Sequence, residues 1–295
     1  MALVANKVVC ITGASRGIGR ACALDFAKYG ASALLLHYFR DGATEEEIQS
    51  LRKEVENDKI QVVTVAGDIA DPLTSAKVGI YVLDNFCQNQ THPAQIVEAG
   101  VKAFGRIDVL VSNAGICPFA EFLTMPHATW ERTRQVNLDG SFYVVQAVAN
   151  QMKSQIPQGG SIIGISSISA LVGGEFQWLA EFLRSRCAPF TSFLSSHYTP
   201  TKAGILSLMQ SCAIALGKYG IRANAVLPGT ISTDINKEDL SDEKKRQYTV
   251  NRTVLGRLGA PDDVSGPVVF LASDLAKYVT GASLLVDGGL FVNLQ

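Results

Sequence analysis

A tyrosine and a lysine four positions apart, Tyr198 and Lys202, are the residues of this chain best suited to moving a proton. Residues four apart share one face of a helix, so the phenol and the ammonium can act on the same group. A free tyrosine has a pKa of about 10 and is a weak base at neutral pH. A fixed positive charge favours the phenolate, and lowering the pKa by ~3 units needs about 4 kcal/mol of differential stabilisation. Such pairs also occur on solvated helices, so the rest of the sequence decides whether this pair is functional.

A glycine-rich turn lies near the start of the chain, between two segments of different pattern. Residues 7–12 form an apolar run that predicts a buried strand, and residues 20–30 predict an amphipathic helix that ends at a glycine. Between them the spacing is Gly-x-x-x-Gly-x-Gly, at Gly13, Gly17 and Gly19. Glycines allow positive φ and let a pyrophosphate approach the backbone at a helix N-terminus. The sequence therefore predicts a dinucleotide site at this turn.

The composition excludes several classes of function. The chain has 295 residues, of which 47% are hydrophobic and 18% charged, and its net charge is −1. This suits one domain with a large core, and it gives no electrostatic reason to expect a nucleic-acid or anionic-membrane partner. We expect no membrane span, no signal peptide and no metal site, because no long apolar run, leader pattern or metal-ligand spacing is present. Six scattered cysteines without a Cys-x-x-Cys pair indicate a reducing, cytoplasmic compartment.

Strand-like and helix-like patterns alternate along the chain. Short apolar runs separated by helical periodicity predict strands that are buried on both faces and joined by crossover helices. We therefore expect an α/β fold with a doubly wound parallel sheet of about seven strands and helices on both faces. Besides residues 7–12, the predicted strands are residues 33–37, 60–66, 107–112, 160–166, 221–227 and 283–286.

Polar residues follow several of these strands directly, where ligands bind in open α/β sheets. Asp68 follows the third strand, residues 113–115 follow the fourth, and Ser167 follows the fifth. Residues 228–233 follow the sixth strand, and Asn137 lies within a long predicted helix. These groups are expected to meet at the carboxyl edge of the sheet.

This assembly resembles the short-chain dehydrogenase/reductase family over essentially the whole chain, which implies a single Rossmann-type domain over residues 1–295. The resemblance implies that Tyr198 is the general base for oxidation and that Ser167 hydrogen-bonds the reacting oxygen. It also implies that Lys202 holds the nicotinamide ribose and lowers the pKa of Tyr198, and that Asn137 supports a water in the proton relay. The motifs that carry it are residues 12–19 and 113–115, Asn137, Ser167, Tyr198 with Lys202, and residues 228–229.

The cofactor implied is NADP or NAD. An acid at the end of the second strand would bind the 2′-hydroxyl of NAD, but none occurs there before Asp41. Arg16 and Arg40 can pair with a 2′-phosphate, which favours NADP slightly. The predicted cofactor residues are Gly13, Ser15, Arg16, Gly17, Ile18, Gly19, Arg40, Asp68, Asn113, Ala114, Gly115, Tyr198, Lys202, Pro228, Gly229, Ile231 and Thr233.

Within that family, residues 159–174, 197–211 and 285–295 resemble the fungal L-rhamnose 1-dehydrogenases. This resemblance implies oxidation of the anomeric carbon of a six-carbon aldose, L-rhamnose, to the 1,4-lactone, with residues 232–254 as the substrate loop. It also implies a homotetramer. Two alternatives stay open: a reductase of another carbonyl, such as a 3-oxoacyl thioester or a polyol/ketose pair, and an inactive cofactor-binding protein.

Two extra segments depart from the family pattern. The spacing between Ser167 and Tyr198 exceeds the pattern by eighteen residues, which correspond to residues 178–195. Residues 78–95 form a second excess of the same length. Residues 178–195 contain several aromatic side chains that could cover a sugar. Alternatively, both segments are translated introns of equal length. Either way, the sequence leaves open whether Ser167 reaches the Tyr198 site.

Overall fold

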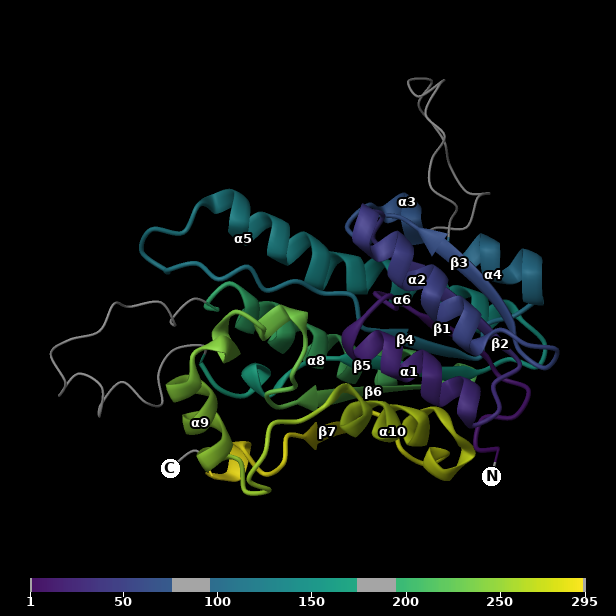
Figure 1. Ribbon diagram of the computed structural model, residues 1–295. Helices are drawn as coiled ribbons and strands as arrows, with labels where there is room; N and C mark the ends of the chain where they lie inside the picture. The colour runs from purple at the N-terminus through teal and green to yellow at the C-terminus, as the bar shows by residue number, and fades with distance from the viewer. Residues whose placement is uncertain (1, 76–95, 174–194, 294–295) are drawn as a thin grey trace, which may run out of the picture.

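A parallel seven-stranded sheet forms the centre of the computed structural model, which describes residues 2–75, 96–173 and 195–293 (Figure 1). The strand order is β3-β2-β1-β4-β5-β6-β7, and every pairing is parallel. Except for Ser195, both predicted extra segments lie outside the described residues. The strands are β1 (Val8–Ile11), β2 (Ala33–Tyr38), β3 (Gln61–Ala66), β4 (Val109–Ser112), β5 (Gly160–Ile165), β6 (Ile221–Pro228) and β7 (Ser283–Val286).

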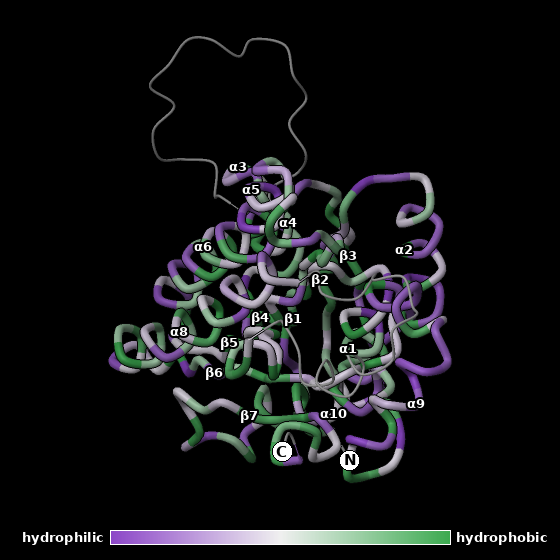
Figure 2. Tube along the Cα trace, turned by 90° about the vertical axis from the view of Figure 1, so that its left-hand side faces the viewer, coloured by the Kyte–Doolittle hydropathy of each residue, from purple (hydrophilic) through white to green (hydrophobic). Residues whose placement is uncertain are grey.

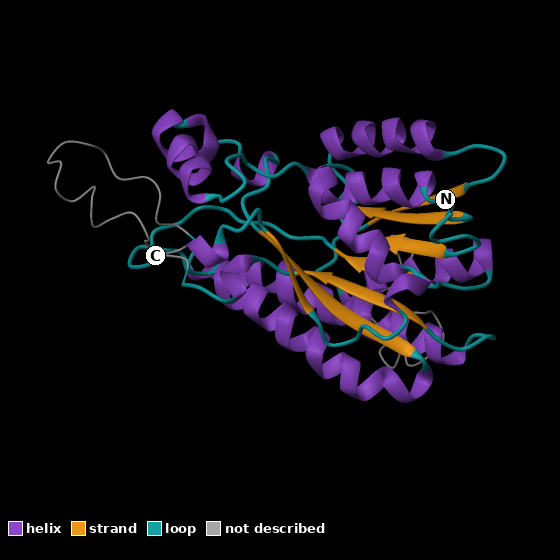
Figure 3. Cartoon of the chain, turned by 90° about the horizontal axis from the view of Figure 1, so that it is seen from below, coloured by secondary structure: helices purple, strands orange, loops and turns teal. Residues whose placement is uncertain are grey.

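Helices cover both faces of this sheet (Figure 3), so the predicted doubly wound arrangement is confirmed. The helices α1, α2 and α10 pack on one face, and α4, α6 and α8 pack on the other. Within the described ranges, no helix is both long and apolar enough to cross a membrane. The helices are α1 (Gly17–Lys28), α2 (Gly42–Val55), α3 (Pro72–Ser75), α4 (Ile96–Phe104), α5 (His127–Arg134), α6 (Gly140–Ser154), α8 (Tyr198–Leu216), α9 (Glu243–Arg252) and α10 (Pro261–Ala272).

The central strands are mostly apolar rather than alternating, because helices bury both of their faces. All residues of β1, β2 and β4 are buried, whereas the edge strand β7 has one exposed and three half-buried residues. Figure 2 shows the strands as a hydrophobic centre. Each fully buried aliphatic side chain contributes about 1.5–3 kcal/mol relative to exposure, so this core holds the carboxyl edge of the sheet in place.

The long helix predicted around Asn137 is not one continuous α-helix, which corrects the sequence prediction. The structure has α5, then a π-helical turn η1 (Gln135–Asp139), then α6. Single-turn π segments within helices occur frequently at functional sites. A hydrophobic period of 3.6 residues does not resolve one such turn, so the interruption was not visible in the sequence.

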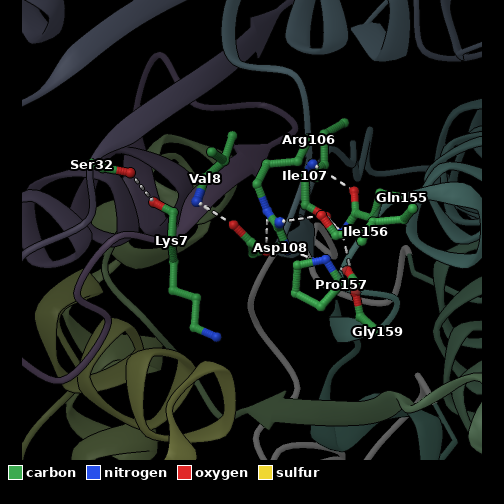
Figure 4. Close-up of polar contacts among 10 residues, drawn as sticks. All are labelled: Lys7, Val8, Ser32, Arg106, Ile107, Asp108, Gln155, Ile156, Pro157 and Gly159. Carbon is green, nitrogen blue, oxygen red and sulfur yellow. Dashed lines mark hydrogen bonds and ion pairs between the residues drawn. The ribbon is translucent and has the colours of Figure 1, made fainter.

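A polar network joins β1, β4 and the end of α6 at the amino edge of the sheet (Figure 4). The carboxylate of Asp108 accepts a hydrogen bond of 2.9 Å from the Val8 N–H, and its other oxygen accepts one of 2.7 Å from Arg106. The Gln155 amide accepts from the Ile107 N–H at 3.1 Å and donates to the Ile107 carbonyl at 2.9 Å. The network lies at the edge opposite the predicted site.

Candidate active site

The carboxyl ends of β1 to β4 open into a groove of about 780 Å³, within the usual size of cofactor sites. A smaller cavity of about 120 Å³ lies between the ends of β5 and β6 and the start of α8. Ile18, Asn113, Gly115 and Thr233 line both spaces, so the two are continuous. We call the larger space the cofactor groove and the smaller one the tyrosine cavity.

Most of the predicted site residues line one of these spaces. Three do not: Gly19 and Asn137 lie behind the lining, and Arg40 is turned toward Glu45 at 3.9 Å with its side chain 75% exposed. Among the predicted residues, the cofactor groove is lined by Gly13, Ser15, Arg16, Gly17, Ile18, Asp68, Asn113, Ala114, Gly115 and Thr233. The tyrosine cavity is lined by Ser167, Tyr198, Lys202, Pro228, Gly229 and Ile231, together with the four shared residues named above.

The glycine turn leaves bare backbone at the N-terminus of α1. Gly13 and Gly17 have φ values of 63° and 56°, in the left-handed region that favours glycine. A Cβ on Gly19 would lie 2.2 Å from the Gly13 carbonyl oxygen, so only glycine allows this close packing. The Asn113 side chain donates to the carbonyls of Thr12 (2.9 Å) and Gly13 (3.0 Å), which holds the turn against β4. This backbone fits a dinucleotide pyrophosphate.

Asn137 fixes the loop after β4 from its buried position in η1. Its Oδ1 accepts from the Ile116 N–H at 2.8 Å, and its Nδ2 donates to the Ile116 carbonyl at 2.9 Å. The same Nδ2 lies 3.2 Å from the Thr201 hydroxyl, which is one turn into α8. The side chain therefore connects the floor of the cofactor groove to the helix that carries Tyr198.

The structure places Ser167, Tyr198 and Lys202 together in the lining of the tyrosine cavity. Ser167 lies close enough to Tyr198 to lower the pKa of the phenol. Lys202 Nζ donates to the Ile165 carbonyl at 2.9 Å and lies 5.3 Å from the centre of the Tyr198 ring. The Ser166 hydroxyl donates to the Lys202 carbonyl at 2.7 Å, so β5 holds the first turns of α8 directly.

Burial dominates the electrostatics of this trio. It raises the pKa of Tyr198 above the ordinary value, the nearby Cys117 raises it further, and the hydrogen bond with Ser167 lowers it. Burial also lowers the pKa of Lys202 to about 8, against an opposing effect of Cys117. The expectation of a depressed tyrosine pKa is therefore wrong for the polypeptide alone, because the same burial disfavours the charged form of both groups. Ionising the phenol needs further positive charge or hydrogen-bond donors at the site.

Several lining residues were missed by the sequence analysis, among them Cys117, Arg132 and His37. Cys117 follows the residues 113–115 motif, and burial raises its pKa to about 11. Arg132 projects from α5 to the Asp68 carboxylate at 2.7 Å. His37 is the penultimate residue of β2 and lines the cofactor groove. No local pattern distinguishes these residues, because only the tertiary fold brings them to the groove.

His37 should make the protein less stable in acid. Its Nε2 lies 3.0 Å from the Gly67 carbonyl, its Nδ1 is buried without a partner among the described residues, and burial lowers its pKa to about 4. An unfolded histidine binds a proton below about pH 6.5, so the stabilisation present above that pH is lost as the pH falls toward 4. The difference corresponds to about 3 kcal/mol. We expect urea denaturation from pH 7 to 4 to show a smaller loss for His37→Gln than for the parent; equal losses would contradict this assignment.

Family models match most of the chain. The short chain dehydrogenase model matches residues 7–79 and 73–179, and the enoyl-(acyl carrier protein) reductase model matches residues 182–291. The chain belongs to the short-chain dehydrogenase family. The resemblance inferred from the sequence motifs is thereby confirmed.

Named relatives of this short-chain dehydrogenase cover its full length. An L-rhamnose 1-dehydrogenase (NAD(P)(+)) from Sphingomonas sp. is 51% identical, with 100% of both chains covered. The L-rhamnose-1-dehydrogenase of Scheffersomyces stipitis is 50% identical over 99% of both. A 3-oxoacyl-[acyl-carrier-protein] reductase from Thermotoga maritima is 35% identical over 97% of this chain and 98% of its own. A solved short-chain type dehydrogenase/reductase from Mycobacterium marinum has a TM-score of 0.76 and 27% identity, covering 97% and 96% of the two chains.

Proposed function

We propose that this protein is an NAD(P)-dependent sugar 1-dehydrogenase that oxidises the anomeric carbon of L-rhamnose to L-rhamnono-1,4-lactone. The observation that carries the proposal is the joint position of Ser167, Tyr198 and Lys202 beside a groove of cofactor size. Full-length relatives at 50–51% identity are named for this reaction.

The residues of the tyrosine cavity have complementary roles in this proposal. Tyr198 accepts the proton of the anomeric hydroxyl, and Ser167 hydrogen-bonds the same oxygen so that the developing charge is stabilised. Lys202 supplies a nearby positive charge, which favours the phenolate. Asn137 holds the loop after β4 in place against the start of α8, and it supports a water in the proton relay.

The cofactor is NAD or NADP, with NADP slightly favoured. When bound, the nicotinamide accepts the hydride from the anomeric carbon. The glycine turn and the α1 N-terminus hold the pyrophosphate, and Asp68, Arg132 and the residues 113–115 line the groove beyond it. In this proposal the remaining predicted cofactor residues also contact the dinucleotide. Arg40 is the weakest candidate among them, because its side chain points to Glu45.

We extend the proposal to the organisation of the protein. Residues 1–295 form one catalytic domain, with residues 78–95 and 178–195 as additions to it. The free cysteines Cys10 and Cys22 are buried thiols, in keeping with a reducing cytoplasm. A homotetramer would bury the apolar groups that α6 and α8 leave exposed, such as Phe142 and Ile214, which are 45% and 87% exposed.

A second candidate is reduction of a 3-oxoacyl thioester, favoured by the identity of 35% with the Thermotoga maritima reductase. The tyrosine cavity would serve either direction, since a protonated Tyr198 is the acid that carbonyl reduction needs. A thioester carries a long acyl chain, whereas a sugar offers several hydroxyl groups, so substrate turnover separates the two.

We expect the purified chain to reduce NAD or NADP with L-rhamnose at a kcat in the ordinary range of about 1–10³ s⁻¹. The measurement is the absorbance of the reduced cofactor with L-rhamnose, L-lyxose and L-mannose. Oxidation of the reduced cofactor with a 3-oxoacyl thioester is measured in parallel as the comparison. Turnover of the thioester without turnover of any aldose would replace the first candidate by the second. Cofactor binding without any turnover would identify an inactive protein.

A further inference from the structure

Arg16 is shared between two carboxylates in the lining of the cofactor groove. It precedes α1, and its Nε lies 3.6 Å from Glu47 Oε2 in α2. Its Nη1 lies 3.5 Å from Asp234 Oδ2 in the short turn η4 (Asp234–Asn236). Both Arg16 and Asp234 line the groove. Three separate elements therefore meet around one guanidinium.

These contacts orient the guanidinium but do not use all of its N–H donors. Both distances exceed a normal hydrogen bond, and Arg16 carries five N–H donors. Glu47 Oε2 is buried and finds no hydrogen-bond donor among the described residues, so the Arg16 charge is what compensates it there. A third carboxylate, Asp41, has its pKa lowered mainly by hydrogen bonds from Thr44 and in part by the Arg16 charge. The local surplus of charge around Arg16 is negative.

Asp234 is held in this position by its neighbour. A Cβ built on Gly17 would lie 3.5 Å from the Thr233 methyl group, so the glycine turn and the loop after β6 are in contact. The Thr233 N–H donates to Asn236 Oδ1 at 3.0 Å, which fixes the turn that begins at Asp234. The backbone of this turn therefore places the Asp234 carboxylate near Arg16, and its position does not depend on side-chain rotation alone.

We propose that Glu47 and Asp234 determine the choice between NAD and NADP by competing with the 2′-phosphate for Arg16. This inference rests on the proposed function. A 2′-phosphate is a stronger, bidentate partner for a guanidinium than either carboxylate at its present distance. Recruiting Arg16 leaves a buried Glu47 oxygen uncompensated and brings two negative charges near the phosphate. The neutral 2′-hydroxyl of NAD leaves both ion pairs intact. The two acids therefore weaken NADP binding and keep NAD competitive.

The test is the dissociation constant of each oxidised dinucleotide, measured by calorimetric titration of the full chain. We expect Glu47→Gln and Asp234→Asn each to tighten NADP binding about two- to fivefold, the range for a partly exposed charge pair, with NAD nearly unchanged. Arg16→Met should weaken NADP binding about tenfold or more, because hydrogen bonds to charged groups are strong. Glu46→Gln is the matched control, since Glu46 is the adjacent, exposed acid on α2 and should alter neither constant.

A double-mutant cycle isolates the role of Arg16. In the Arg16→Met background, Asp234→Asn and Glu47→Gln should gain clearly less NADP affinity than in the parent. The same gain in both backgrounds would show simple repulsion and overturn the competition. Equal changes for NAD and NADP would overturn it too. If the parent binds neither dinucleotide, the proposed function fails; if it binds both and the ratio never moves, only this inference fails. Unfolding midpoints confirm that each variant is folded.

Discussion

Replacing Tyr198 by phenylalanine should lower kcat for L-rhamnose oxidation about 10²–10⁴-fold, the usual contribution of a positioned acid–base group. The ring and its packing at the start of α8 stay in place, and only the hydroxyl that meets Ser167 is removed. Oxidation needs the deprotonated base, so the parent rate should rise with pH while Lys202, whose pKa burial lowers to about 8, still carries the charge that favours the phenolate. The variant should lose that rise while its dinucleotide affinity, measured by titration, stays close to the parent value.

Tyr219 offers a matched control for this result. It also lies beside lysines, with its ring 4.8 Å from Lys153 Nζ and 5.1 Å from Lys218 Nζ. Those ammonium groups lower the pKa of Tyr219, first through a hydrogen bond from Lys153. It lines neither the cofactor groove nor the tyrosine cavity. Tyr219→Phe should therefore keep the parent kcat. A Tyr198→Phe variant with full activity and an unchanged pH profile would remove Tyr198 from the chemistry.

The contrast between these two tyrosines shows how much of the site can be predicted from the sequence. Both have lysine neighbours, but a pKa lowered at the surface does no chemistry, whereas Tyr198 is buried next to Ser167. The glycine turn was predictable because positive φ at Gly13 and close packing at Gly19 each favour glycine at one particular position. The strands were predictable because burial on both faces leaves an apolar run.

Other features depend on contacts between distant segments, and the sequence could not show them. Arg16 and Arg40 had equal claims on a phosphate, yet Arg16 lines the groove and Arg40 is turned to Glu45. His37 reaches the groove only because β2 pairs with β3 in this register. The π turn around Asn137 exists where that side chain binds both backbone groups of Ile116. The depressed pKa expected for Tyr198 failed for the same reason, since burial is a property of the whole fold.

Replacing Arg106 by methionine should lower the free energy of unfolding by about 3 kcal/mol, the lower end of the cost of breaking a buried ion pair. Asp108 is only 8% exposed in its side chain, and Arg106 donates to it from Nη2 at 2.7 Å and from Nε at 2.9 Å. Without this partner the carboxylate retains only the Val8 N–H among the hydrogen bonds described. Methionine keeps much of the aliphatic packing, so the loss reports the charge together with the hydrogen bonds that Arg106 donates to the Ile156 and Pro157 carbonyls. Urea denaturation at pH 7 measures it.

The control is Arg52→Met, which breaks the Arg52–Glu56 pair on the surface of α2. Its shortest bond, 2.8 Å, is nearly as short as the Arg106 contact of 2.7 Å, but both side chains are 40% exposed. Solvent replaces such a pair readily, so the expected loss is under about 0.5 kcal/mol. Equal losses for the two variants would show that burial of Asp108 does not set the energy. Because the network lies at the amino edge of the sheet, Arg106→Met should retain the parent KM for L-rhamnose at temperatures where it is folded. A raised KM would mean that the two edges of the sheet are coupled.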